Sequence, residues 1–445
     1  KVQLSIPGEN SSVSQVTIVQ RPSTPFEEAK VKLHAQLVAS LDLPSLQGIP
    51  RRRLEGQLRQ TLEGMVRAQP LPITGAEQEQ LVEDILDEVL GYGPIERLLH
   101  DPTISDILIN GPHQVFVERR GRLEEAEIQF RDEEHLLHVI NRIVSAVGRR
   151  VDEATPMVDA RLRDGSRFNA IIAPVALEGP VVSIRRFGAN PIRRDDLIAL
   201  GTLPEVIMNL LAACVHSRLN ILVSGGTGSG KTTFLNVLSS FIPVTDRVVT
   251  IEDAAELRLQ QKHVVRLETR PPNLEGEGAI SARALVRNAL RMRPDRIIVG
   301  EIRGDECIDM LQAMNTGHEG SISTIHANSP RHALGRLQTM VGLGLGNMPS
   351  TAIREMISDA LNIIVQIARL SDGRRRIVSI TELTGMESGV ISTQEIFRFR
   401  QQTIDADGNV HGTFEATGIR PAFARRLEAH GVEIDARAFQ YRADV

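Results

Sequence analysis

The sequence predicts an α/β protein: a doubly wound, largely parallel sheet, preceded by a small α+β domain and an N-terminal helical bundle. Beyond Pro204, short apolar strand patterns alternate with helical patterns, which is typical of a doubly wound sheet. Between about residues 100 and 200, strand pairs mix with helices, and before residue 100 leucines recur at helical spacing. A chain of 445 residues is also too long for one core, so two or more domains are expected.

The N-terminal hundred residues lack strand patterns. Residues 1–22 are polar and without periodicity, and we expect a flexible tail. Residues 23–99 predict a helical bundle, with helices that begin at Thr24, after Pro50 and at Thr74. Glutamates three residues after both threonines complete capping boxes, and prolines separate the helices.

The middle of the chain has a different pattern. Residues 100–187 predict a compact α+β domain, with a hairpin that turns at Arg120-Gly121. A Pro- and Arg-containing stretch at 188–204 is read as a linker. Residues 205–445 then predict the doubly wound domain with a C-terminal extension, whose strands are followed by a poorly patterned end.

Composition and charge limit the functions that the chain can have. The 41% hydrophobic and 24% charged content is ordinary for a soluble globular protein. A net charge of -5, no Trp and two Tyr argue against nucleic-acid binding. Cys214 and Cys307 form no disulfide or metal pattern, which fits a reducing compartment. The sequence shows no run of eighteen apolar residues and no signal peptide, so a cytoplasmic location is expected.

A phosphate-binding loop is predicted at "GGTGSGKTT". It fits the pattern G-x-x-x-x-G-K-[ST] and lies between a predicted strand and a predicted helix, where backbone N–H groups can surround phosphate oxygens. Lys231 would reach the β- and γ-phosphates of ATP and Thr232 would ligate Mg²⁺. Only 5 of the 51 basic residues are lysines, so a lysine at this point is informative. The alternative is a glycine-rich turn with an exposed lysine. The predicted ATP-binding residues are Gly225, Gly226, Thr227, Gly228, Ser229, Gly230, Lys231, Thr232 and Thr233.

Two predicted strands end in carboxylates. "RIIVGE" runs directly into Glu301, about seventy residues after the loop, and "VVTIED" ends in Glu252 and Asp253. Since ligands bind at the carboxyl ends of parallel strands, these acids are expected beside Mg²⁺ or the attacking water. The alternatives are a core ion pair between Glu301 and Arg303, and an N-cap role that fits Asp253 better than Glu252.

A third strand ends in a histidine. "GSISTIHA" places His326 at the end of an apolar run, after a polar loop that contains His318. A strand histidine is more often a satisfied core residue. Beside a phosphate-binding loop, however, a neutral imidazole could sense the γ-phosphate.

Together these segments resemble the secretion ATPase superfamily of type II and type IV secretion and type IV pilus motors. The resemblance depends on four blocks in family order: Walker A "GGTGSGKTT", Asp box "TIEDAAEL", Walker B "RPDRIIVGEIRG" and His box "TGHEGSISTIHANSP". Within the superfamily the chain looks most like the CpaF/TadA branch, which drives tight-adherence (Flp) pili. The similarity covers roughly residues 75 to 385. It implies a RecA-like P-loop NTPase domain in a bilobed subunit, and a hexameric ring with ATP between the lobes.

The resemblance also implies roles for single residues. Glu252 corresponds to the Asp-box acid, often assigned as general base, Glu301 to the Walker B glutamate and His326 to the His-box histidine. Gly300 stands where other Walker B blocks carry an aspartate, so metal ligation would come mostly from Thr232 and water. The family also uses arginines of the N-terminal lobe against the phosphates, and structural ion pairs are the alternative for them. The candidates here are Arg163, Arg167, Arg185 and Arg186.

The resemblance implies an ATP hydrolase that powers assembly or retraction of a Tad/Flp-type type IV pilus or a related secretion machine. Its expected partners are further copies of the chain, as a hexamer, and an inner-membrane platform protein, with peripheral association to that membrane. One rival reading is a nucleic-acid motor of the RecA type, and another is a scaffold that binds ATP only to assemble. An ABC signature and a guanine-specificity motif are absent from the sequence.

Overall fold

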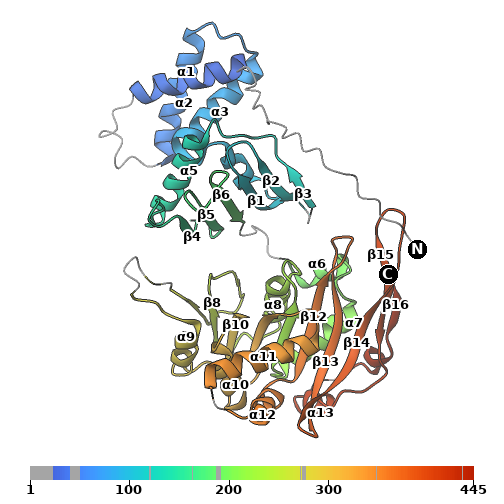
Figure 1. Ribbon diagram of the computed structural model, residues 1–445. Helices are drawn as coiled ribbons and strands as arrows, with labels where there is room; N and C mark the ends of the chain where they lie inside the picture. Colours follow the sequence, from blue (N-terminus) through green and yellow to red (C-terminus); the bar gives the residue numbers. More distant parts are fainter. Residues whose placement is uncertain are drawn as a thin grey trace, which may run out of the picture. The chain divides into compact units, whose positions relative to one another are not determined.

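In a computed structural model, the chain folds into two parts (Figure 1). The structure describes residues 24–40, 51–119, 122–162, 164–186, 192–270, 272, 277–346, 348–432 and 434–445. The predicted tail (1–22) and the predicted hairpin turn at Arg120-Gly121 lie outside these residues.

The N-terminal part begins with a three-helix bundle formed by α1 (Pro25–Ser40), α2 (Arg51–Ala68) and α3 (Gly75–Leu90). Thr74 and Glu77 form the predicted capping box at the start of α3, with both hydrogen bonds present. The bundle core contains leucines and isoleucines that are completely buried, among them Leu33, Leu62 and Ile85. Helical spacing of these residues therefore places them on one buried face of each helix.

A six-stranded sheet forms the rest of this part, with the strand order β3-β2-β1-β6-β5-β4. Helix α5 (Glu133–Ala146) begins at Asp132, whose side chain accepts a hydrogen bond from His135 N, and it buries one apolar face. A short 3-10 helix, η2 (Gly93–Ile95), and α4 (Glu96–His100) precede the sheet. The strands are β1 (Ile104–Asn110), β2 (Val115–Arg119), β3 (Arg122–Glu125), β4 (Met157–Arg161), β5 (Arg167–Ile171) and β6 (Val181–Arg185).

The C-terminal part contains a ten-stranded sheet of order β16-β15-β14-β13-β12-β7-β11-β10-β8-β9. The six strands from β12 to β9 in this order are mutually parallel, which confirms the predicted doubly wound, largely parallel sheet. They are β7 (Ile221–Gly225), β8 (Val248–Glu252), β9 (Val264–Glu268), β10 (Arg296–Ile302), β11 (Ile322–His326) and β12 (Ile363–Arg369). Because these strands are parallel, their carboxyl ends share one edge of the sheet.

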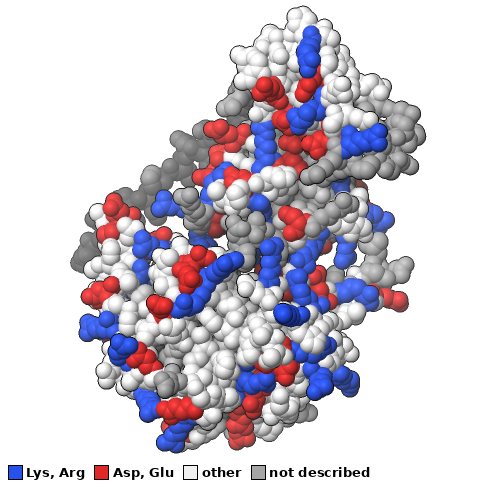
Figure 2. Space-filling model, turned by 180° about the vertical axis from the view of Figure 1, so that it is seen from behind, with Lys and Arg blue, Asp and Glu red and all other residues white. Residues whose placement is uncertain are grey.

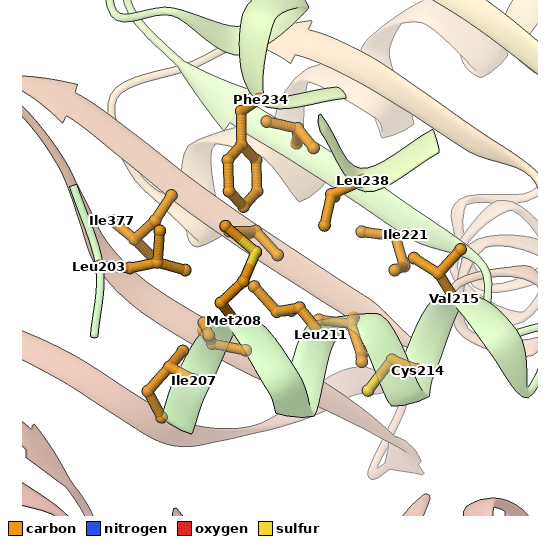
Figure 3. Close-up of a cluster of buried hydrophobic side chains, with 14 of the residues drawn as sticks. Leu203, Ile207, Met208, Leu211, Cys214, Val215, Ile221, Phe234, Leu238 and Ile377 are labelled. Carbon is orange, nitrogen blue, oxygen red and sulfur yellow. The ribbon is translucent and has the colours of Figure 1, made fainter. Parts of the chain in front are cut away.

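Helices cover both faces of this sheet, so its strands are apolar on both sides. One face packs against α6 (Arg194–Ala199), α7 (Glu205–His216), α8 (Lys231–Ser239) and α13 (Ala424–Ala429). The other face packs against α9 (Ala282–Ala289), α10 (Glu306–Asn315), α11 (Pro330–Leu345) and α12 (Ser350–Ala360). In Figure 3, Met208 of α7 lies near Phe234 of α8, and Leu211 of α7 belongs to the same buried cluster.

The end of the chain is folded, although its sequence pattern is weak. Strands β13 (Arg375–Glu387), β14 (Val390–Ile404), β15 (Val410–Ala416) and β16 (Arg442–Asp444) continue the sheet in antiparallel fashion, with a 3-10 helix, η3 (Ala436–Gln440), before the last strand. Part of the stretch read as a linker forms α6, and Leu197 and Leu203 are buried in the adjacent core. The predicted domain limits stay predictions.

Candidate nucleotide-binding site

The phosphate-binding loop follows β7 and enters α8 directly. A Cβ on Gly225 would lie 2.5 Å from Ile367 O, and Gly228 and Gly230 have φ values of +69° and +93°. These glycines are therefore required by close backbone approach and by left-handed conformation. Gly230 is the N-cap of α8 and offers no side-chain hydrogen bond, so the first N–H groups of α8 stay available for an anion.

Lys231 lies in the first turn of α8, and only 8% of it is exposed. Its Nζ donates to Gly226 O at 2.9 Å and lies 3.3 Å from His326 Nε2. Burial lowers the pKa of Lys231, and Glu301 opposes that shift. The ammonium group is thus held inside the loop by one carbonyl and one imidazole.

His326 ends β11, as predicted, and its ring lies between Lys231 and Glu301. Nε2 is 3.0 Å from Glu301 Oε1. An ammonium group only donates, so Nε2 must accept from Lys231 and the ring proton lies on Nδ1. Burial and then Lys231 lower the pKa of His326, which favours this neutral ring. Within the described part of the chain, Glu301 Oε1 is consequently buried without a hydrogen-bond donor.

Glu301 lies at an irregularity of β10, where the register with β11 shifts between Val299 and Ile302. Such bulges redirect side chains near functional sites. Glu301 Oε2 accepts from Arg303 Nε at 2.8 Å, and Arg303 Nη1 reaches Asp253 Oδ2 at 3.1 Å. The ion pair with Arg303 that was the alternative reading is thus present. It lies at the same sheet edge as Lys231, so it does not separate Glu301 from the candidate site.

Glu252 ends β8 and is only 4% exposed. Its Oε1 accepts from Glu256 N at 2.9 Å and Leu257 N at 3.0 Å, whereas Oε2 has no hydrogen-bond partner among the described residues. Burial raises the pKa of Glu252 to about 7, although the two backbone hydrogen bonds act in the opposite direction. A carboxylate of this kind suits proton transfer near neutral pH.

Gly300 explains why a Walker B aspartate is missing here. A Cβ at position 300 would lie 2.9 Å from Glu252 Cγ, a separation at which the Glu252 side chain or the backbone would have to shift. The adjacent register pairs Val299 with Ile251, so residue 300 of β10 lies next to Glu252 of β8. The glycine therefore makes room for the Glu252 side chain.

The N-cap reading of Asp253 is wrong, because residues 253–263, all of which are described, form no helix before β9. Its carboxylate instead pairs with Arg303. The same arginine also pairs with Glu301, as the alternative interpretation of the sequence predicted.

Three of the candidate arginines lie in or directly after strands of the six-stranded sheet. Arg167 begins β5, Arg185 ends β6 and Arg186 follows it, while Arg163 lies outside the described residues. Their action on the phosphates stays a prediction. Sequence reasoning missed a different arginine, Arg375 of β13, whose Nε donates to Gly228 O at 3.1 Å.

Among the described residues, no group of three or more His, Cys, Asp or Glu side chains could hold a metal ion. No helix among those residues has both the length and the apolar content that a membrane span needs. A phosphate-bound metal ion, which needs few protein ligands, is compatible with the first finding.

The chain is similar to known proteins over most of its length. The family model described as "Type II/IV secretion system protein" matches residues 88–411. A "Putative conjugal transfer protein" of Mycobacterium tuberculosis is 39% identical over 311 residues, which is 68% of this chain and 87% of that protein. The conjugal transfer protein TrbB of Rhizobium radiobacter is 33% identical over 281 residues, covering 62% and 83% of the two chains. The VirB11 ATPase of the Brucella suis type IV secretion system is a similar solved structure, with 29% identity, 64% and 91% coverage and a TM-score of 0.36. A family match over most of its length shows that this chain belongs to the type II/IV secretion system protein family.

Proposed function

We propose that this protein hydrolyses ATP and that the hydrolysis drives a Tad/Flp-type type IV pilus or a related secretion machine. The observation that carries the proposal is the convergence of three groups beside the P-loop. Lys231 Nζ lies 3.3 Å from His326 Nε2, and Glu301 Oε1 lies 3.0 Å from the same nitrogen. A structural glycine-rich turn would have no need of an imidazole and a carboxylate from two neighbouring strands beside its lysine.

Lys231 would move when nucleotide binds. Its two contacts, to Gly226 O and His326, are ones that phosphate oxygens can replace with stronger, charge-assisted hydrogen bonds. His326 would then lose its donor, and its ring would be free to take a proton or a γ-phosphate contact. Nucleotide binding would thus change the contact between His326 and Glu301, which lies on the other side of the ring.

Glu252 is the better candidate for the general base. Its Oε1 is fixed by two backbone N–H groups and its Oε2 has no partner among the residues described, so Oε2 is the atom that can accept a proton. The attacking water would give that proton to Oε2 as its oxygen bonds to the γ-phosphorus and the bond to ADP breaks. Glu301, whose Oε2 is already paired with Arg303, would instead orient and polarise the attacking water.

Thr232 would hold Mg²⁺ through its hydroxyl group. It lies half-buried in the first turn of α8, where the N-cap glycine leaves the helix end open, and the carboxylates of Glu252 and Glu301 lie at the same sheet edge. The residues present therefore fit a hard cation bound mainly by phosphate and water. When bound, Mg²⁺ neutralises charge on the phosphate oxygens.

The hexameric ring, the inner-membrane platform partner and the choice of the Tad/Flp pilus depend on the resemblance to the CpaF/TadA branch. Peripheral attachment to the membrane through that partner is part of the same proposal. Acidic and basic side chains are mixed on the face seen in Figure 2, which gives no support there to a nucleic-acid motor.

Phosphate release by Lys231→Ala tests the proposal. The variant should lose turnover while keeping its fold, because it removes the cation that lies within the loop. Lys262→Ala is the matched control, since Lys262 is an exposed lysine of the same part of the chain. Hydrolysis that persists in folded Lys231→Ala protein would show that the loop is structural. Light scattering with and without ATP would test the ring.

A further inference from the structure

Arg375 contacts the phosphate-binding loop from outside the parallel strands that form the nucleotide edge. Its Nε donates to Gly228 O at 3.1 Å. Its Cδ lies 3.3 Å from the point that a Cβ on Gly230 would occupy. The two contacts fall on the two loop glycines with positive φ, which are the residues whose conformation shapes the loop. Arg375 therefore contacts two loop residues whose backbone conformation no side chain restricts.

The position of Arg375 is fixed by the core. Ile377, two residues further along β13, is completely buried and packs in the same cluster as Phe234 of α8 (Figure 3). Ile377 N also donates to Thr202 O at 2.9 Å. Because side chains two residues apart share one face of a strand, Arg375 is presented on the face that α8 covers.

A second arginine lies opposite the first. Arg369, the last residue of β12, pairs in register with Arg375 of β13, and its Nη1 is 3.8 Å from the point where a Cβ on Gly228 would lie. Two positive charges beside the loop would attract a polyphosphate.

We infer that Arg375 is a positioning residue for nucleotide binding. Its hydrogen bond to Gly228 O stabilises the conformation of the P-loop, while Arg369 adds positive charge beside the loop. The inference rests on the proposed function and deepens it: the antiparallel C-terminal strands take part in the nucleotide site. Because Arg375 acts on the loop rather than on the γ-phosphate, it should affect ADP and ATP equally.

Nucleotide affinity of Arg375→Met tests this inference. Methionine keeps the apolar stem beside Gly230 and removes the hydrogen bond and the charge. A hydrogen bond from a charged donor is worth about tenfold in binding, so the Kd values for MgADP and MgATP should each rise about tenfold. The kcat at saturating ATP should stay within about threefold, since the chemical step does not use this group. The assays are displacement of a fluorescent ADP analogue and phosphate release by the full chain.

Two further variants complete the test. Arg375→Lys keeps the charge and a donor, so it should recover most of the lost affinity. Arg374→Met removes an adjacent exposed arginine and the same charge, and it should bind like wild type. Wild-type affinity in folded Arg375→Met, or equal weakening in Arg374→Met, would overturn the inference. Should Arg375→Met fail to fold, Arg375→Lys is tested alone. If that variant keeps the wild-type Kd values for both nucleotides and lowers only kcat, the inference is overturned. A wild-type chain that binds no nucleotide would instead refute the proposed function.

Discussion

Substitution of Glu252 by glutamine should stabilise the protein at alkaline pH and abolish its turnover. Glutamine keeps an oxygen that can accept from Glu256 N and Leu257 N, the two donors that fix Oε1. It removes the charge, which burial at the end of β8 makes unfavourable. Removal of the charge changes the stability in a pH-dependent way, whereas a change in packing does so equally at every pH. Stability measured at two pH values therefore separates the charge from the packing.

The magnitude follows from the raised pKa of Glu252. A shift from the ordinary 4.5 to about 7 destabilises the folded state by about 3 kcal/mol above pH 8, at about 1.4 kcal/mol per pKa unit. Between pH 4.5 and 7 the unfolded chain binds fewer protons than the folded one, so this destabilisation grows as pH rises through that window. At pH 5 it is only about 1 kcal/mol. The new amide N–H₂ lacks an acceptor and costs about 1 kcal/mol at every pH.

Glu252→Gln should therefore melt about 4–8 °C higher than wild type at pH 8.5 and within about 2 °C of it at pH 5. Thermal unfolding of nucleotide-free protein at both pH values measures this. Glu355→Gln is the matched control, because Glu355 is an exposed glutamate of α12. An equal shift at the two pH values would assign the effect to packing, and a lower melting temperature at pH 8.5 would refute a destabilising buried charge. Turnover at pH 8 should fall at least about 100-fold.

Two further predictions concern the other site residues. Glu301→Gln should bind ATP within about threefold of wild type and hydrolyse it about 100-fold more slowly, since the amide keeps the shape and removes the charge opposite Arg303; an unfolded protein without a rate defect would make Glu301 a core ion-pair residue. Mixing inactive Lys231→Ala subunits with inactive Arg185→Ala/Arg186→Ala subunits should restore partial turnover, because an arginine supplied by a neighbour can raise the rate about 10³–10⁵-fold; no recovery in rings shown to exchange subunits would place these arginines outside the chemistry of the neighbouring site.

The parallel sheet and the P-loop could be predicted because both depend on local pattern. Uninterrupted apolar runs such as Ile297–Val299 indicate strands buried on both faces, and the glycines at 228 and 230 have the positive φ values that the motif needs. Once the strands are parallel, their last residues must meet at one edge. Glu252, Glu301 and His326 therefore followed from sequence without any knowledge of side-chain contacts.

The remaining features depend on distances between segments far apart in the chain. Glycine at position 300 looks like a missing ligand in the sequence, whereas its cause is the side chain of Glu252 on the neighbouring strand. The contact of Arg375 with Gly228 joins residues 147 positions apart. No local pattern carries that information, because the register of β12 and β13 sets which arginine reaches the loop.

Two cations at the sheet edge have partners before any nucleotide binds. Arg303 contacts both Glu301 and Asp253, and Lys231 lies beside the histidine that borders Glu301. Both cations therefore already have partners, which a polyphosphate would have to replace. ATP would need either the release of Lys231 from Gly226 and His326, or further cations. Arg369 and Arg375 lie beside the loop in the same part of the chain and would add positive charge there, while the arginines proposed to act between subunits would add it only in an assembled ring. On this reasoning an isolated subunit should bind nucleotide through its own charges and hydrolyse it poorly.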